Sequence, residues 1–599
     1  MDETLNGQSS VFESWSVGGA IWRALKALKR FALAHRAETA CACLLLLMSV
    51  NLLTAISRKS ITNDEVVHIP AGYYHLVAGD FQLNNEHPPL VKMWAALPLL
   101  FVQPEEPSPA DEPIANSAEK TWGFDEEFWH ANRARFLAIS FWPRVIMVPV
   151  TIALGVFIFA FARTLFGARG AVFAVALFTL EPTMLAHGRI VHTDVPVALT
   201  YLVFFFALLN YFRARTLRRA LILGLASGLA LITKFSMIVL LPLLGCLMLA
   251  AFVFAPRLNE SRKRVGLHAT IVVCLALFTI NAAYQFQSPP VAPADVQWVQ
   301  ARSPGAFDRW MTFFRVGSKV VPTYYLFGQY NVMLHNRDGH PTSLLGHYST
   351  MGWRYYFPVA FALKTTLPFL LISIAALSWT LWMWLRKKDN RFLWLLVPLA
   401  IYAALSMTSH INIGVRHFLP VYPFLFIAGG ALLERLLSVR RARYLAIALA
   451  VVTFGWMGVE VARAYPDYMP YMNQLASGHP HWWYLSDSNV EWGDDVGALA
   501  DYLKARGETS VRGALSGGWS TLASYDVEFI SLAPPNSNSR DTRYVAIGAS
   551  YLNGSTVPSF QSDGVQLTEE QRVNYFDQYR RRTPEAIFGG SIFLYREHE

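Results

Sequence analysis

Four carboxylates and three histidines lie together in one short stretch near the start of the chain, residues 61–90. The stretch reads ITNDEVVHIPAGYYHLVAGDFQLNNEHPPL and contributes Asp64, Glu65, His68, His75, Asp80, Glu86 and His87. Carboxylates and imidazoles are the side chains that most often move protons in enzymes. The stretch therefore predicts acid–base chemistry, and the alternative is a solvated acidic loop with no catalytic role.

The spacing of these side chains separates their roles. Asp64 and Glu65 are adjacent, so on a helix they diverge by about 100° and cannot both point at one atom. His68 lies four residues after Asp64 and shares its helical face. Glu86 and His87 precede two prolines, which hold the chain in an extended conformation. Both members of the Asp-Glu pair are catalytic candidates, and Asp64 is favoured because His68 lies beside it.

A second polar cluster interrupts the apolar sequence at EPTMLAHGRIVHTDVPVAL, residues 181–199. It contributes Glu181, His187, Arg189, His192 and Asp194. Charged groups between apolar runs are costly in a bilayer and generally line a cavity. Asp194 is accordingly a candidate for shaping the site, and the alternative is a helix cap formed by Thr193 or Asp194.

Three cations occupy comparable positions next to apolar runs. They are Lys234 in LITKFSM, Lys364 in FPVAFALKTTLPF and Arg416 in SHINIGVRHFLPVYPF. The planar guanidinium of an arginine is well suited to phosphate. We expect Arg416, with Lys234 or Lys364, to bind a phosphate, and the alternative is snorkelling of these side chains toward the membrane surface.

The sequence does not assign a cofactor. Histidines and carboxylates also bind metals, but no HExxH or comparable spacing occurs in the chain. A divalent metal stays an open alternative without a ligand set. Neither a P-loop nor a Rossmann glycine pattern is present, so we expect no nucleotide at the site.

The elements that must position these clusters are membrane helices. Of the 599 residues, 53% are hydrophobic and 16% charged, which is too apolar for a soluble multidomain protein. A span needs about 20 apolar residues. Eleven runs approach that length, at about 39–56, 140–162, 168–186, 194–212, 219–233, 235–255, 266–283, 356–385, 392–409, 417–434 and 443–462.

The basic residues predict the orientation of these spans. They cluster in alternate connections, so the positive-inside rule places the N-terminal tail, residues 1–38, in the cytoplasm. The net charge of +9 belongs to these clusters, and we expect no nucleic-acid partner. The membrane domain is then 39–462, with large outer segments at 57–139 and 284–355, and residues 463–599 form an outer domain.

Two outer segments need a structural interpretation of their own. PPLVKMWAALPLLFVQP, residues 88–104, is short, contains Lys92 and as a twelfth span would invert every later loop, so an interfacial helix is favoured. The tail after 463 combines a polar helix candidate, LSDSNVEWGDDVGALADYLKARG, with strand candidates such as RYVAIGASYL. This mixture predicts a small α/β domain.

Several of these motifs resemble the GT-C superfamily of polytopic glycosyltransferases, and specifically bacterial relatives of protein O-mannosyltransferases and of lipid A aminoarabinose transferases. The motifs that carry the resemblance are NDEVVHIPAGYYHLVAGDFQLNNEHPPL, EPTMLAHGRIVHTDVP, GWRYYFPVAFALKTTLPFLL, NIGVRHFLPVYPF and YMPYMNQLASG with LSDSNVEWGDD. By position, Asp64 matches the base of the family. Glu86 matches a site-forming acid of the aminoarabinose transferases, which have Lys where this chain has His87.

The resemblance implies transfer of a sugar, a mannose-like hexose above all, from a polyprenyl phosphate to an acceptor hydroxyl with inversion. Asp64 would take the proton, the three cations would bind the departing phosphate, and Glu86, His87, His68 and Asp194 would shape the site. The acceptor stays open among a protein, a glycolipid and a glycan. The resemblance also implies a bacterial inner membrane protein with its C-terminal domain outside the cytoplasm.

Two alternatives to this activity stay open at the level of the sequence. One is a glycolipid or lipid A modifying transferase with the same fold and a different acceptor. The other is a transporter or flippase, which is disfavoured because the charged clusters lie at the outer ends of spans rather than near the midplane of the membrane.

Overall fold

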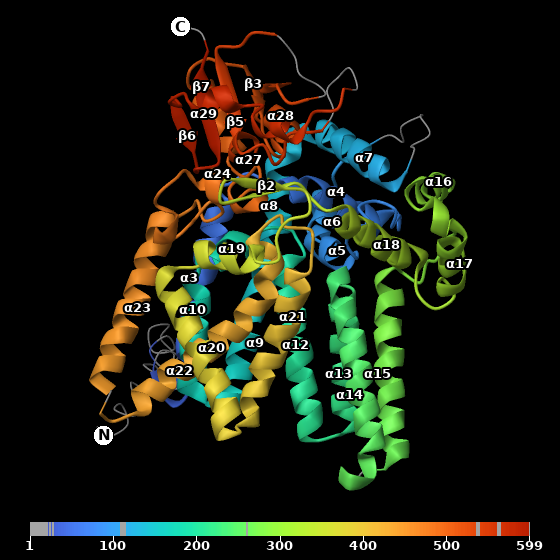
Figure 1. Ribbon diagram of the computed structural model, residues 1–599, viewed down its shortest axis with the longest axis vertical. Coiled ribbons are helices and arrows are strands. Elements are labelled where there is room, and N and C mark those ends of the chain that lie inside the picture. The colour runs from blue at the N-terminus through green and yellow to red at the C-terminus, as the bar shows by residue number, and fades with distance from the viewer. Residues whose placement is uncertain are drawn as a thin grey trace, which may run out of the picture.

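The protein is a bundle of long helices with a small sheet at one end (Figure 1). The computed structural model describes residues 22, 26, 29, 30, 32–107, 116–258, 261–441, 443–534, 540–559 and 565–597. Within these residues, nine helices are long and apolar enough to cross a membrane. The C-terminal strands lie at one end of the bundle, and the connection at residues 213–217 lies at the other. We name these two ends the sheet end and the far end.

Each apolar run of the sequence becomes a helix or a pair of helices. They are α3 (Arg36–Ile56), α8 (Phe136–Val145) with α9 (Met147–Phe166), α10 (Ala168–Thr179), α12 (Asp194–Arg213), α13 (Leu217–Leu231), α14 (Leu240–Val253), α15 (Arg262–Ala283), α20 (Leu367–Lys387), α21 (Leu393–Met407), α22 (Tyr422–Ser438) and α23 (Arg443–Ala464). The polytopic helical class is confirmed. Helices α10 and α13 are not among the nine helices that are long and apolar enough to cross a membrane, so the total of eleven spans stays a prediction.

Small residues bring α10 and α22 close together in the middle of the bundle. A Cβ atom at Gly430 would lie only 2.3 Å from the backbone oxygen of Gly170, so only glycine allows this approach of the two backbones. The contact matters for the site because α22 follows the short 3-10 helix η7 (Val415–Val421), which carries Arg416.

The first long connection folds over the sheet end of the bundle. It contains α4 (Asn63–Val77), α5 (Leu90–Ala96), α6 (Leu99–Val102) and α7 (Ser117–Ala131). The candidate interfacial segment 88–104 is thus two short helices, and neither is long enough to span a membrane. The indole Nε1 of Trp129 in α7 donates to the backbone oxygen of Val66 in α4, at 2.8 Å. This bond helps to hold α4, which carries the Asp-Glu pair.

The second long connection also lies at the sheet end. It contains α16 (Pro293–Arg302), α17 (Phe307–Gly317), α18 (Thr323–Asp338), the two antiparallel strands β1 (Thr342–Leu344) and β2 (His347–Ser349), and α19 (Tyr356–Lys364). Two short helices in other connections complete this layer, α11 (Pro182–His187) and the 3-10 helix η3 (Phe235–Val239).

The C-terminal segment forms a five-stranded mixed sheet with short helices around it. The strands are β3 (Ser510–Ala514), β4 (Glu528–Ser531), β5 (Tyr544–Gly548), β6 (Ala586–Phe588) and β7 (Ile592–Arg596), in the order β4-β3-β5-β7-β6. β3 is parallel to β4 and β5, and β7 is antiparallel to β5 and β6. The helices are α24 (His481–Tyr484), α25 (Val496–Lys504), α26 (Gly518–Leu522), α27 (Ala549–Leu552), α28 (Glu569–Val573) and α29 (Asp577–Arg580).

Buried ion pairs join this segment to the membrane helices. Arg189 and Asp494 meet at 2.7 Å, with their side chains 0% and 1% exposed. Lys59, just after α3, pairs with Asp495 and Asp467. Removing one partner of a buried pair is costly because the other charge is left without a counter-ion. The stretch 485–495 is therefore fixed against the ends of the helices.

Candidate active site

The two acids of the Asp-Glu pair have different environments. Glu65 closes a capping box at the start of α4 by accepting from the backbone N–H of Thr62 at 2.8 Å. Its other oxygen accepts from the backbone N–H of Val191 at 2.9 Å. Glu65 thus fastens the connection before α12 to α4, and both of its oxygens are occupied. The side chain of Asp64 points elsewhere, as the helical geometry predicts.

Asp64 forms an ion pair with Arg416, which is 352 residues away in the sequence. The two atoms, Asp64 Oδ2 and Arg416 Nη1, are 2.6 Å apart. Burial raises the pKa of Asp64, but the positive charge of Arg416 outweighs burial and holds that pKa below its usual range. Asp64 is consequently ionised at neutral pH and is able to accept a proton.

The guanidinium of Arg416 is held in place by the C-terminal segment. Its Nε donates to the hydroxyl of Ser488 at 3.0 Å, and its Cζ lies 4.1 Å from the centre of the Trp492 ring. Gly414, with φ +151°, allows Ser488 to approach, because a Cβ there would lie 2.3 Å from the Ser488 oxygen. The C-terminal segment is thus part of the site.

Asp194 is the second anion beside Arg416. Its Oδ2 lies 3.5 Å from Arg416 Nη1, and it also pairs with Lys234. The backbone N–H of Asp194 donates to Nδ1 of His192 at 2.8 Å, and burial lowers the pKa of His192 to about 4. A neutral His192 leaves two carboxylates, Asp64 and Asp194, balanced by two cations in the buried cluster.

A cavity of about 570 Å³ begins beside this cluster and extends between the membrane helices. Its polar end is formed by Glu86, His87, Lys234, His335, Asn336 and His417. Its apolar wall includes Ile238, Val239, Pro242 and Leu405, from η3, α14 and α21. A charged end and an apolar wall suit a ligand with an anionic head and a hydrocarbon tail.

A second cavity of about 340 Å³ lies on the other side of Glu86 and His335, which line both cavities. Its remaining wall comes mainly from α7, α16 and α18, and includes Trp298 and Arg302. These elements lie outside the membrane-spanning helices (Figure 1). Glu86 thus separates a cavity among membrane helices from one at the sheet end.

The two remaining candidate residues, His68 and Lys364, have different places relative to the Asp64–Arg416 ion pair. Nδ1 of His68 bonds to the backbone oxygen of Val191 at 2.9 Å, and the His68 ring stands 5.4 Å from that of His87. Lys364 donates to the backbone oxygens of Met469 and Asn489. Burial lowers the pKa of Lys364 to about 7. The structure groups His68 with the site but uses Lys364 to hold the C-terminal segment.

Sequence reasoning missed the contribution of the stretch LSDSNVEWGDD. Its polar residues suggested the start of a helix, but α25 begins only at Val496, and residues 485–495 run into the site. The signal was present, because several short polar residues beside a tryptophan are typical of loops rather than of a helix. No group of three or more His, Cys, Asp or Glu side chains in the described part of the chain is arranged to hold a metal.

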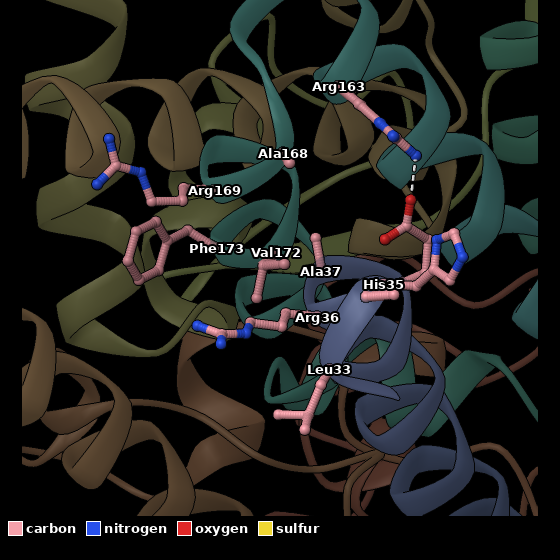
Figure 2. Close-up of a pocket in the computed structure, with 11 residues that line it drawn as sticks. Leu33, His35, Arg36, Ala37, Arg163, Ala168, Arg169, Val172 and Phe173 are labelled. Atoms are coloured by element: carbon pink, nitrogen blue, oxygen red, sulfur yellow. Dashed lines mark hydrogen bonds and ion pairs between the residues drawn. The ribbon is translucent and has the colours of Figure 1, made fainter. Parts of the chain in front are cut away.

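A third cavity, of about 560 Å³, lies at the far end of the bundle (Figure 2). Its lining includes Arg36, Arg163, Arg169 and Phe173, from α3, α9 and α10. The dashed contact in Figure 2 joins Arg163 to Glu38, at 2.5 Å. Glu38, the only carboxylate among the described residues that line this cavity, is therefore already paired.

A comparison with protein-family models matches one part of the chain. The model described as dolichyl-phosphate-mannose-protein mannosyltransferase matches residues 137–284, which include Asp194 and Lys234. The match covers 148 of the 599 residues. In this part of the chain it supports the resemblance of the motifs to GT-C glycosyltransferases that use polyprenyl-phosphate donors.

Solved structures similar to this chain share little sequence with it. ArnT from Cupriavidus metallidurans bound to undecaprenyl phosphate is 14% identical, with a TM-score of 0.44 over 81% of this chain and 74% of that one. Archaeal oligosaccharyltransferase AglB from Archaeoglobus fulgidus, in complex with an inhibitory peptide and a dolichol-phosphate, is 11% identical, with a TM-score of 0.45 over 86% and 70%. No match was found among curated protein sequences.

Proposed function

We propose that this chain is a GT-C glycosyltransferase that moves a mannose-like hexose from a polyprenyl phosphate to an acceptor hydroxyl at the sheet end of the bundle. The observation that carries the proposal is the ion pair between Asp64 and Arg416, beside a cavity with one charged end and one apolar wall. The hexose is proposed from the description of the family model, which names mannose.

The 570 Å³ cavity is the proposed donor site. Lys234 lines it and is connected to Arg416 through Asp194. A phosphate at this end would meet Lys234 directly, with Arg416 behind Asp194, and the two carboxylates now balance the charges of these two cations. The polyprenyl chain would leave along Ile238, Val239 and Leu405 into the bilayer, where apolar burial favours it.

Donor binding and activation of the base are coupled in this arrangement. When a phosphate takes up part of the positive charge of Arg416, Asp64 loses part of the field that depresses its pKa. Asp64 then becomes a stronger base at the moment when the donor is in place. An enzyme without a donor would keep Asp64 in the ion pair and away from acceptors.

The chemistry is a displacement at the anomeric carbon. The acceptor oxygen forms a bond to that carbon on the face opposite the phosphate, and its proton passes to Asp64. The bond from the anomeric carbon to the phosphate oxygen breaks, and its electron pair stays on the polyprenyl phosphate. Arg416 and Lys234 stabilise the charge that develops there. Attack from the opposite face inverts the configuration of the sugar.

The proposed location is the inner membrane of a bacterium, with the sheet end outside the cytoplasm. The far end carries the basic residues Arg36, Arg163 and Arg169, which agrees with the positive-inside rule. The acceptor is proposed to be a protein, glycolipid or glycan hydroxyl that enters from the aqueous side.

The direct test measures release of polyprenyl phosphate. Purified protein in nanodiscs receives undecaprenyl-phosphate mannose together with solubilised membranes and periplasmic extract from a strain without this protein. We expect free undecaprenyl phosphate and labelled mannose on an acceptor in equal amounts. Absence of released undecaprenyl phosphate would overturn the proposal. Movement of intact undecaprenyl-phosphate mannose across the bilayer of proteoliposomes would then identify a flippase.

A matched pair of variants makes this test specific to the site. Asp64→Asn should abolish most of the release, while Asp80→Asn, in the same connection, should not. Asp80 pairs with Lys120 and accepts from the backbone N–H of Gln82, away from Arg416. Equal loss in both variants would indicate damage to the fold of the connection instead of loss of a base.

A further inference from the structure

Only part of the charged cluster around Arg416 is open to solvent. The side chains of Arg416 and Asp194 are 6% and 1% exposed, whereas that of Asp64 is 21% exposed. Two other titratable side chains at this opening are partly exposed, Asp487 at 20% and His340 at 32%. A molecule arriving from the aqueous side would therefore touch Asp64, Asp487 and His340.

Asp487 has an unusual backbone conformation. It begins the short 3-10 helix η9 (Asp487–Asn489) with φ +55°, a left-handed region that residues other than glycine seldom occupy. The conformation is held because the carbonyl of Asp487 accepts from the N–H groups of Val490 and Glu491, at 2.9 and 3.0 Å. Strained residues of this kind concentrate at functional sites.

The side chain of Asp487 has one oxygen available for a ligand. Its Oδ1 accepts from the backbone N–H of Ser488 at 2.6 Å. Its Oδ2 lies 4.0 Å from Nε2 of His340, beyond hydrogen-bond distance. The charged and titratable groups that face it from other elements are Arg416 in η7, Asp64 in α4, Tyr356 in α19 and His340 after α18.

We propose that Asp487 is a second substrate-contacting carboxylate, which accepts a hydrogen bond from the acceptor next to the hydroxyl that Asp64 deprotonates. The inference rests on the proposed function and adds the chemistry of the acceptor, which presents a second O–H or N–H donor close to the attacking hydroxyl. Ser488 and Trp492, in the same stretch, hold Arg416, so one stretch contacts both halves of the site.

The placement favours the acceptor over the donor. Asp487 belongs to the stretch before α25, at the sheet end, and its carboxylate would repel the phosphate of the donor. Burial, with the nearby charge of Asp64, outweighs the charge of Arg416 and raises the pKa of Asp487 to about 6. Asp487 is therefore an anion above about pH 6 and a weaker hydrogen-bond acceptor below it.

The test compares Asp487→Asn with a matched control, Asp526→Asn. Asn tolerates the left-handed conformation well, so the variant keeps the backbone. Asp526 is also left-handed, with φ +59°, but it is exposed and pairs with Arg133. Transfer from undecaprenyl-phosphate mannose to the solubilised membranes and extract is measured as a function of acceptor concentration and pH. Affinity for undecaprenyl phosphate is measured separately.

We expect Asp487→Asn to lower the kcat/KM for the acceptor about tenfold, the ratio expected between a charged and a neutral hydrogen bond. Its affinity for undecaprenyl phosphate should stay within twofold of wild type. The wild-type kcat/KM for the acceptor should fall as pH drops through about 6, and the variant should lack this step. Asp526→Asn should behave as wild type in every measurement.

Two outcomes would overturn the inference. Weaker binding of undecaprenyl phosphate by Asp487→Asn would show that Asp487 acts only as a counter-ion that positions Arg416. Unchanged use of the acceptor, with an unchanged pH profile, would remove Asp487 from the site. Absence of undecaprenyl phosphate release by wild-type protein would instead overturn the proposed function. This result can be told apart from the other two, because they concern only the Asp487→Asn variant.

Discussion

The two large cavities at opposite ends of the bundle have almost the same volume, about 570 and 560 Å³. At the sheet end, Asp194 and Arg416 are buried and face each other. At the far end, Arg163 and Arg169 are 51% and 72% exposed, and water screens their charges. The two ends therefore differ in the burial and balance of their charges rather than in the volume of their cavities, and this difference is the reason for proposing the reaction site at the sheet end.

Of the changes at the two ends of the bundle, one at Asp64 should have the largest effect on the rate of transfer. Asp64→Asn keeps the shape of the side chain but removes the proton acceptor, and a positioned base contributes roughly 10²–10⁴-fold to a rate. Single-turnover transfer at saturating donor and acceptor should slow by that factor, while the affinity for undecaprenyl phosphate persists. A rate within about threefold of wild type, under 1 kcal/mol of barrier, would exclude Asp64 as the base.

The next largest effect is expected at Arg416. Arg416→Lys keeps the charge but loses the planar fork and the contact with Trp492, so the kcat/KM for the donor should fall about 10- to 100-fold. Arg416→Ala should lower the kcat/KM for the donor further. It should also lower the stability of the fold, because Asp64 and Asp194 are left with one cation fewer. Arg163→Lys at the far end is the matched control. Equal losses in Arg416→Lys and this control would erase the distinction between the two cavities.

A smaller effect on transfer is expected at Glu65, although it is next to Asp64. Glu65→Gln leaves one of the two backbone donors, Thr62 or Val191, with a poorer partner, which should cost about 1–3 kcal/mol of stability. Folded protein should keep its rate of transfer within a few-fold of wild type. Thermal unfolding and transfer are measured on the same sample, and a loss as large as that of Asp64→Asn would make Glu65 the base.

The sequence was sufficient for the features that depend on local pattern. The apolar runs identify the helices because a membrane requires length and hydrophobicity alone. The pair Thr62 and Glu65 also fits the capping-box pattern, Thr-x-x-Glu, before an apolar segment, which is a local sign that Glu65 is structural. Helical geometry likewise separates Asp64 from Glu65.

The features that the sequence could not provide depend on long-range contacts. Arg416 meets Asp64 across 352 residues, and Ser488 meets Arg416 across 72. No periodicity or spacing encodes such pairs. The interpretation of LSDSNVEWGDD as a helix start followed from its composition, and only the fold shows that this stretch lies beside Arg416.

The smallest effect is expected at the far end. Arg36→Ala and Arg169→Ala remove two cations from the cavity of Figure 2. Arg169 is 72% exposed and pairs with Glu434 at the surface, where ion pairs contribute little, about 0–1 kcal/mol. The double variant should therefore transfer sugar within twofold of wild type in nanodiscs of neutral lipid, at equal amounts of folded protein. If the donor enters at the far end instead, the loss should be tenfold or more and should appear in the KM for undecaprenyl-phosphate mannose. That result would place the donor site in the far-end cavity, where the charges are exposed, and not in the sheet-end cavity.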